Sequence, residues 1–266
     1  MSSIRVALGL AGVLTLTAAH ADAGVLWGNN YGTNGVAEEF DAATGQLLQQ
    51  VNYGSGITGT GIAVVGTTAY VADAADGIIR TFNTLTGTLG ASIVTGHGGF
   101  GGLAADATGL WANDFSAGNQ AYHITFGGAI DQTISLSGCT GYCSGIAYAF
   151  GQLFANRGTA DGTAKYDRYY PNGAADVNAG LDTPNGTGLA IDEATGTAYV
   201  ADGLDNSVYV YDTYSNLLRV LTLDGPLPAN GVDNRYLFGL AYVPEPATLA
   251  IFAFALAGLG VARRRA

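Results

Sequence analysis

The chain has 266 residues, of which 48% are hydrophobic and 41 are glycine, and this length suits one large all-β domain. It carries 10 Lys or Arg against 21 Asp or Glu, which gives a net charge of −11. Because nucleic-acid binding depends on cationic side chains that neutralise phosphates, this balance excludes a nucleic-acid partner. We interpret the acidic charge as a source of solubility, with cation binding as the alternative.

The first 23 residues have the pattern of a secretory signal peptide. Arg5 gives a positive start, residues 6–17 form an apolar run, and small residues precede a cleavage point after Ala23. We therefore expect residues 1–23 to form a signal helix that is removed on export. The mature chain would then lie in an oxidising compartment.

Residues 25–53 contain three predicted strands, and the first of them includes Leu26-Trp27-Gly28-Asn29. Related tetrapeptides recur at Tyr70–Asp73, Leu110–Asn113, Leu153–Asn156 and Tyr199–Asp202. Each later copy follows a Gly-Ile/Leu-Ala triplet, whereas the copy at Leu26 has no triplet before it.

The triplet itself occurs five times, at intervals of 41 to 51 residues. Its copies begin at Gly61, Gly102, Gly145, Gly188 and Gly239. A repeat of this length that holds four strands is typical of a β-propeller blade.

The clearest copy spans residues 188–223. Its four strands are expected at Gly188–Ile191, Thr197–Ala201, Val208–Tyr211 and Leu217–Leu223. The β-branched and aromatic residues of these runs suit a half-buried pleated surface, and Gly, Asn and Asp supply the turns between them.

The fifth triplet has no tetrapeptide after it, so the first and last repeats complete each other. We expect strand 238–243 to be the innermost strand of the blade whose other three strands come from residues 25–53. Closing the ring in this way leaves no exposed edge strand at its ends. The sequence thus predicts one domain over residues 24–243, a five-bladed β-propeller with four-stranded antiparallel blades. Six blades would require a degenerate unit in the longer final interval.

The only cysteines are Cys139 and Cys143. Two cysteines make half a zinc site, and no nearby His completes it. In an exported chain we expect them to form a disulfide that fastens the link between the third and fourth blades.

Aligning the repeats places one polar residue at the end of the second strand of each blade. These residues are Asn29, Asp73, Asn113, Asn156 and Asp202. We expect them at one mouth of the central channel, where their oxygens could bind a hard cation such as Ca²⁺. The alternative is structural, because Asn and Asp at strand ends hydrogen-bond the backbone of the following turn. We predict no other cofactor or metal.

No catalytic residues are predicted. Two histidines follow the signal peptide. His123 lies within a strand, where packing or a surface position explains it, and His97 lies in a loop between blades without a defined Ser or Asp partner. A cluster of Arg157, Lys165 and Arg168 with nearby tyrosines could bind an acidic sugar or a partner protein. Its alternative is a solvated outer strand with packed tyrosines.

The C-terminus combines three features. Pro244, Glu245 and Pro246 precede the uncharged run 247–262, and Arg263, Arg264 and Arg265 follow it. With flanking residues the run is adequate for a transmembrane helix, with the arginines on the cytoplasmic side.

This tail, residues 244–266, resembles the PEP-CTERM sorting signal of exported bacterial proteins. The resemblance implies recognition and cleavage by an exosortase, anchoring in the inner membrane through residues 247–262, and later display on the cell surface or release. The repeats separately resemble NHL and YVTN propeller families, through Thr68–Asn83 and Thr197–Asp212.

We therefore expect an exported envelope or matrix protein whose propeller is a non-catalytic binding module for an exopolysaccharide or a protein. One alternative is a metal-dependent hydrolase or lactonase that uses the channel-mouth residues. Another is a structural matrix component without a specific ligand.

Overall fold

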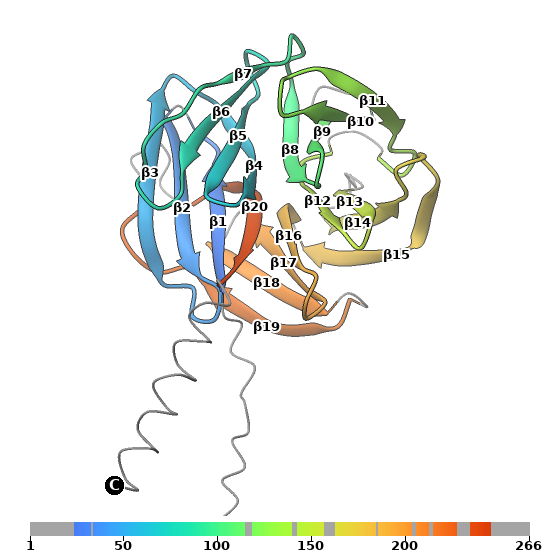
Figure 1. Cartoon of the computed structure of the whole chain (residues 1–266). Helices are drawn as coiled ribbons and strands as arrows, with labels where there is room; N and C mark the ends of the chain where they lie inside the picture. The colour runs from blue at the N-terminus through green and yellow to red at the C-terminus, as the bar shows by residue number, and fades with distance from the viewer. Residues whose placement is uncertain are drawn as a thin grey trace, which may run out of the picture.

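The computed structural model describes residues 24–32, 34–114, 119–139, 143–156, 163–184, 186–203, 206–212, 215–227 and 235–245. These residues form 20 strands in five four-stranded antiparallel sheets, and the sheets stand around a central axis as the blades of a propeller (Figure 1). The predicted all-β, five-bladed fold is confirmed. The signal segment 1–23, the apolar run 247–262 and the terminal arginines lie outside the described residues.

The strands of each blade are given in order from the innermost to the outermost. The first blade is β20 (Leu237–Pro244), β1 (Gly24–Asn30), β2 (Asn34–Asp41) and β3 (Leu47–Ser55). The second is β4 (Gly59–Val65), β5 (Thr68–Asp73), β6 (Ile78–Asn83) and β7 (Ile93–Val94). The third is β8 (Phe100–Ala105), β9 (Gly109–Asp114), β10 (Gln120–Thr125) and β11 (Ile130–Ser135). The fourth is β12 (Ile146–Ala149), β13 (Gln152–Asn156), β14 (Thr163–Tyr169) and β15 (Ala175–Pro184). The fifth is β16 (Gly186–Asp192), β17 (Thr197–Asp202), β18 (Ser207–Asp212) and β19 (Leu217–Thr222).

The ring closes as the offset of the repeats predicts. β20 pairs with β1 in antiparallel register, and Val243 lies opposite Val25. β20 also packs against β16 and β4, so it occupies the innermost position between the fifth and second blades. We call the end of the ring where the five inner strands end the tail side, because the chain enters β1 and leaves β20 there. The opposite end is the far side.

The glycine of each triplet lies where neighbouring inner strands come closest. A Cβ built on Gly61 would lie 2.1 Å from the Leu103 nitrogen, and one on Gly145 would lie 2.0 Å from the Thr187 oxygen. One on Gly239 would lie 2.6 Å from the Ile62 nitrogen. No side chain fits at these distances, so the triplet begins with glycine because the inner strands pack backbone to backbone.

The hydrophobic core lies between the blades. One cluster joins Trp27 and Tyr53 of the first blade to Ile62 and Phe82 of the second, with the Trp27 and Phe82 ring centroids 5.3 Å apart. The sheets therefore bury both faces, and each blade depends on its neighbours for its core.

The strand predicted at residues 238–243 is one residue longer at each end in the structure. β20 runs from Leu237 to Pro244, and Pro244 pairs with Gly24. Proline is tolerated there because β20 is an edge strand of its sheet and Pro244 is its last residue.

Candidate functional site

The five polar residues predicted at the channel mouth lie at matching positions on β1, β5, β9, β13 and β17, towards the far side. All are buried, with exposed fractions of 0–5%. Asn29, Asn113 and Asn156 each donate a side-chain hydrogen bond to a backbone carbonyl beside the next blade: Thr60 at 3.2 Å, Cys143, and Gly186 at 2.8 Å.

The hydrogen bonds of these three amides connect adjacent blades. The structural alternative to cation binding had instead predicted hydrogen bonds to the backbone of the turn that follows each strand. Asp73 does bond its own turn, because it accepts from the Ala75 backbone at 3.0 Å, and it also pairs with Arg80 at 3.3 Å. Among the residues that the structure describes, no three or more His, Cys, Asp or Glu side chains gather closely enough to hold a metal ion. Binding of Ca²⁺ by these residues stays a prediction.

A buried ion pair that sequence reasoning missed fastens the closed ring. Arg235, which is 2% exposed, approaches both oxygens of the fully buried Glu38 with its Nε, at 3.2 and 3.1 Å. Glu38 also accepts from Asn30 at 2.7 Å and from Gln50 at 2.8 Å. The Arg235 guanidinium further donates to the Leu223, Gly225 and Pro226 carbonyls and lies 5.4 Å from the Phe40 ring centroid.

The cysteines are joined as predicted. Cys139 and Cys143 form a disulfide with their Cα atoms 6.0 Å apart, in the link between β11 and β12. Two tyrosines of the fourth blade, Tyr166 and Tyr169, are fully buried and match the packed alternative, whereas Tyr170 is exposed. Arg168 pairs with Asp176 at 2.9 Å, while Arg157 lies outside the described residues.

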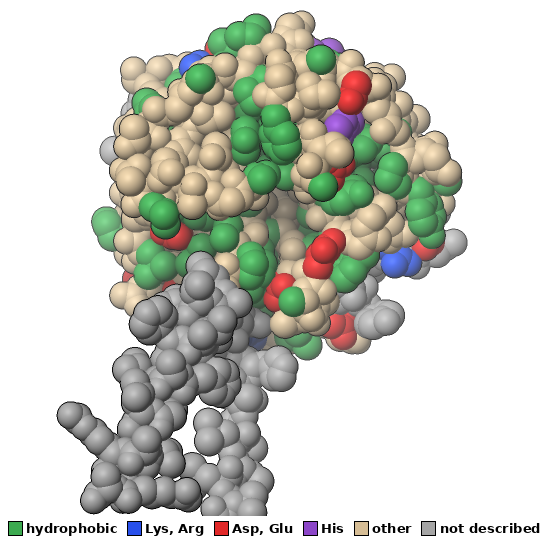
Figure 2. Space-filling model, in the orientation of Figure 1, with side chains coloured by type: hydrophobic (Ala, Val, Ile, Leu, Met, Phe, Trp, Pro, Cys, Tyr) green, Lys and Arg blue, Asp and Glu red, His purple; other side chains and the backbone are tan. Residues whose placement is uncertain are grey.

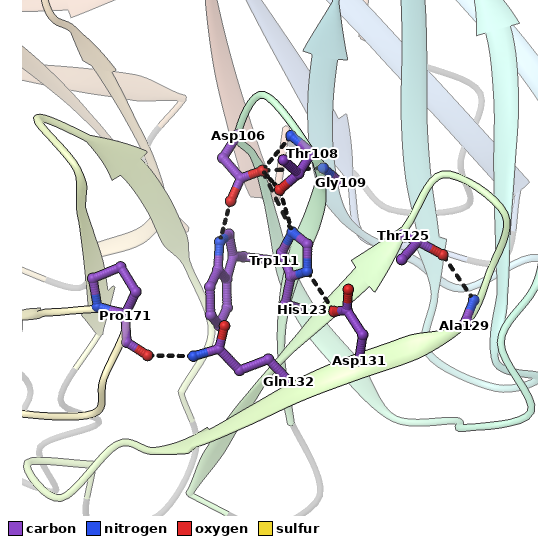
Figure 3. A network of polar contacts seen from close by, with 10 residues as sticks. All are labelled: Asp106, Thr108, Gly109, Trp111, His123, Thr125, Ala129, Asp131, Gln132 and Pro171. Carbon is purple, nitrogen blue, oxygen red and sulfur yellow. Dashed lines mark hydrogen bonds and ion pairs between the residues drawn. The ribbon is translucent and has the colours of Figure 1, made fainter.

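His123 is the centre of a polar network in the third blade (Figure 3). Its Nδ1 lies 2.6 Å from Asp131, and its Nε2 lies 3.2 Å from the Thr108 hydroxyl and 3.4 Å from Asp106. Asp106 also accepts from the Trp111 indole at 2.9 Å. The network ties the turn between β8 and β9 to strand β10 and to the start of β11, all at the tail side.

Burial alone would raise the pKa of Asp106, but hydrogen bonds from Thr108 and Trp111 and the charge of His123 outweigh it and lower that pKa. His97, the other histidine, packs with its ring centroid 5.5 Å from Phe100 and 4.4 Å from Tyr122. The structure therefore brings neither histidine next to a Ser or Cys nucleophile within the described part of the chain.

The central channel holds a cavity of about 100 Å³. Its lining comes from the inner strands alone, three consecutive residues from each, and none of them is charged. The last residue of each set lies nearest the tail side. We call these five residues the tail-side mouth: Val64, Ala105, Tyr148, Ile191 and Tyr242.

Two tyrosines make this mouth partly aromatic. Tyr242 stacks on Tyr199, with ring centroids 5.3 Å apart and planes 10° apart. Burial is the main cause that raises the pKa of Tyr148, and the nearby negative charges of Asp106 and Glu193 raise it further. The Tyr148 hydroxyl therefore stays protonated. In Figure 2, hydrophobic side chains surround a hollow at the centre of the ring, and isolated acidic side chains lie beyond them.

The sequence pattern predicts the site at the far-side mouth of the channel, because the five Asn and Asp residues there are the most evident polar repeat. The residues of the tail-side mouth follow each triplet directly, so their signal was present at the fourth position of every copy. Its composition of Val, Ala, Tyr, Ile and Tyr resembles core and gave no chemical cue.

Comparisons with known proteins support the predicted sorting motif of the tail and the propeller fold. Residues 243–265 match the model of the PEP-CTERM protein-sorting motif. The tail is a PEP-CTERM sorting motif. It implies export, processing by an exosortase and membrane anchoring through the C-terminal segment. No helix in the described ranges is both long and apolar enough to cross a membrane, and the apolar run of the PEP-CTERM tail lies outside them.

The propeller is similar to a chain in the solved structure entitled "Crystal structure of Nidogen/Laminin Complex", at 16% identity and a TM-score of 0.55. That alignment covers 82% of this chain and 98% of the other. A Myxococcus xanthus glutaminyl cyclase aligns at 15% identity and a TM-score of 0.46, over 70% of each chain. At such identities the likeness to the nidogen/laminin structure supports the fold alone. No curated protein matches the chain.

Proposed function

We propose that the propeller is a non-catalytic binding module of an exported envelope or matrix protein, and that it binds a saccharide without negative charge at the tail-side mouth. The supporting observation is the hollow at the centre of the ring, whose lining carries no charge and includes two tyrosines. Ligand sites in proteins are usually concave, with a few polar groups that fix orientation. Here Tyr148 and Tyr242 supply both an apolar face and a hydroxyl.

The size of the hollow limits how the ligand binds. A volume of about 100 Å³ is well below the roughly 300–1,000 Å³ of the pockets that enclose small-molecule ligands. It is too small to enclose a whole ligand, so it would receive a protruding edge of a sugar chain that lies across the mouth. We expect weak binding per site and stronger retention by a polymer that engages many copies.

The charge near the mouth selects the class of saccharide. Asp106 and Glu193 lie close enough to Tyr148 to raise its pKa, and the turns that follow the inner strands contain no Lys or Arg. An acidic polymer would meet like charge, whereas an uncharged or amino sugar would not.

A catalytic role has less support. Nucleophilic catalysis needs a nucleophile positioned beside a base, but His123 contacts two carboxylates and Thr108, and His97 lies against aromatic rings. We therefore propose no enzymatic activity and no cofactor for the described propeller.

The proposal can be tested with the chain that ends after Glu245, which retains every strand. Immobilised oligomers of glucose, glucosamine and an acidic uronate serve as the probes. We expect retention on glucose or glucosamine oligomers and none on the uronate. Tyr148→Ala should abolish retention, because it removes an aromatic ring from the mouth.

Tyr170→Ala is the matched control, since this tyrosine is 46% exposed in the turn between β14 and β15, away from the channel. It should leave retention unchanged. Equal retention of the Tyr148→Ala variant, or retention on the uronate alone, would contradict the proposal. If no saccharide is retained, a protein ligand becomes the better hypothesis.

A further inference from the structure

The point at which the chain leaves the propeller lies beside the mouth. Tyr242, a residue of the mouth, precedes Pro244 by two positions on β20. Pro244 pairs with Gly24, so the two ends of the described chain meet at one site on the tail side. The PEP-CTERM motif begins at residue 243, which means that its first residues belong to the innermost strand of the ring.

Little chain separates this strand from the apolar run. β20 ends at Pro244 and the uncharged run begins at Ala247, three residues later. Three extended residues span at most about 10 Å. The polar layer on each side of a bilayer is roughly 5–8 Å thick. An anchored tail therefore cannot hold the mouth far from the lipid headgroups.

The turns on the tail side suit such contact. Val65, the last residue of β4, and Phe150, in the turn after β12, are 37% and 50% exposed, and the turns between first and second strands contain no Lys or Arg. Three further large apolar side chains are exposed in the turns between third and fourth strands at the same end: Leu85, Phe126 and Tyr170. With no basic patch to attract anionic lipid, the tail itself must bring this face to the membrane.

We propose that the anchored tail holds the tail side of the propeller against the surface of the lipid bilayer, so that the mouth is closed until the tail is removed. The contact with lipid follows from the geometry of β20 and does not require that the mouth binds a saccharide. Its consequence for ligand access rests on the proposed function.

Three exposed alanines allow a matched test. Ala194 follows β16 and Ala107 follows β8, so both lie on the tail side, in blades on different sides of the ring. Ala75 follows β5 on the far side. Ala194 and Ala75 occupy equivalent turns, in which the backbone nitrogen donates to Asp192 or Asp73 at 3.0 Å.

Each alanine is replaced in turn by cysteine in the full chain, which is reconstituted in phosphatidylcholine vesicles. Labelling by a bulky, water-soluble maleimide measures access, without reductant so that the native disulfide stays closed. We expect loss of labelling at Ala194→Cys and Ala107→Cys, and full labelling at Ala75→Cys. In the chain that ends after Glu245, all three should label equally.

A second measurement detects lipid directly, through the fluorescence of a small dye on the same cysteines and its quenching by headgroup-nitroxide lipid. Quenching at residues 194 and 107 but not 75 supports the proposal. Equal labelling and quenching at all three positions would overturn it. Protection at residue 194 alone would show a tilted ring with an open mouth and would also overturn it. These readouts involve no saccharide, so failure of saccharide binding leaves them decisive.

Discussion

Single residues hold the tail side of the third blade together. The Asp106 carboxylate accepts from the Thr108 backbone and hydroxyl, both at 2.7 Å, from the Gly109 backbone at 3.0 Å and from the Trp111 indole. Four donors and the nearby His123 all favour its ionised form. One carboxylate therefore organises a whole turn, and its charge state matters to stability.

The lowered pKa of Asp106 gives stability a defined dependence on pH. A group whose pKa is lower in the folded state stabilises the fold above its unfolded pKa, near 4, and this contribution is lost as the pH falls through the folded pKa. Asp106→Asn should therefore lower the free energy of unfolding clearly at pH 7 and by less at pH 3. Urea unfolding at the two pH values measures this. The same loss at both would contradict the prediction.

The ion pair of Glu38 and Arg235 shows what residue patterns cannot reveal. The two residues are 197 positions apart, and neither belongs to a repeated motif. Neither Glu38 nor Arg235 was singled out by the sequence analysis. Buried charges are paired because desolvation is costly, but a sequence does not state which charges become buried.

At the scale of the strand, repetition carried most of the prediction. The offset between the first tetrapeptide and the last triplet led directly to the pairing of β20 with β1. The bonds from Asn29, Asn113 and Asn156 to the next blade were not predicted, because an alignment of repeats shows equivalent positions and not the partner across the interface.

The inner-strand glycines give a test at this scale. A Cβ on Gly188 would lie 2.8 Å from the backbone carbon of Gly239, so Gly188→Ala must push two blades apart. Such overpacking typically costs about 1–3 kcal/mol, which urea unfolding measures. Gly98→Ala is the control, because its nearest contact would be 3.8 Å away, and it should change stability little. Equal effects of the two would show that close packing does not select this glycine.

For the whole molecule, we expect closure of the ring to make the propeller unfold as one cooperative unit. Every inner strand packs between two others, and β20 completes both the first blade and the circle. The two chain ends meet on the tail side, so the opposite end of the ring faces away from the tail.

Truncation tests the importance of that closure. A chain that ends after Tyr236 loses β20 and leaves the β1 edge unpaired, which invites pairing with other copies. We expect it to associate and to lose its cooperative urea transition, as light scattering and unfolding curves would show. A chain that ends after Glu245 keeps β20 and should unfold in one transition. A cooperative monomer without β20 would contradict this prediction.

The place of β20 also decides when folding can finish. The ribosome makes β1, β2 and β3 first and their inner partner last, so the first blade waits for almost the whole chain to be synthesised. Until Arg235 emerges, Glu38 lacks the guanidinium that neutralises it. A product of interrupted synthesis therefore lacks the strand that completes the ring, and it also lacks the sorting motif that starts within that strand. Only chains that already contain the start of the sorting motif can therefore complete the propeller.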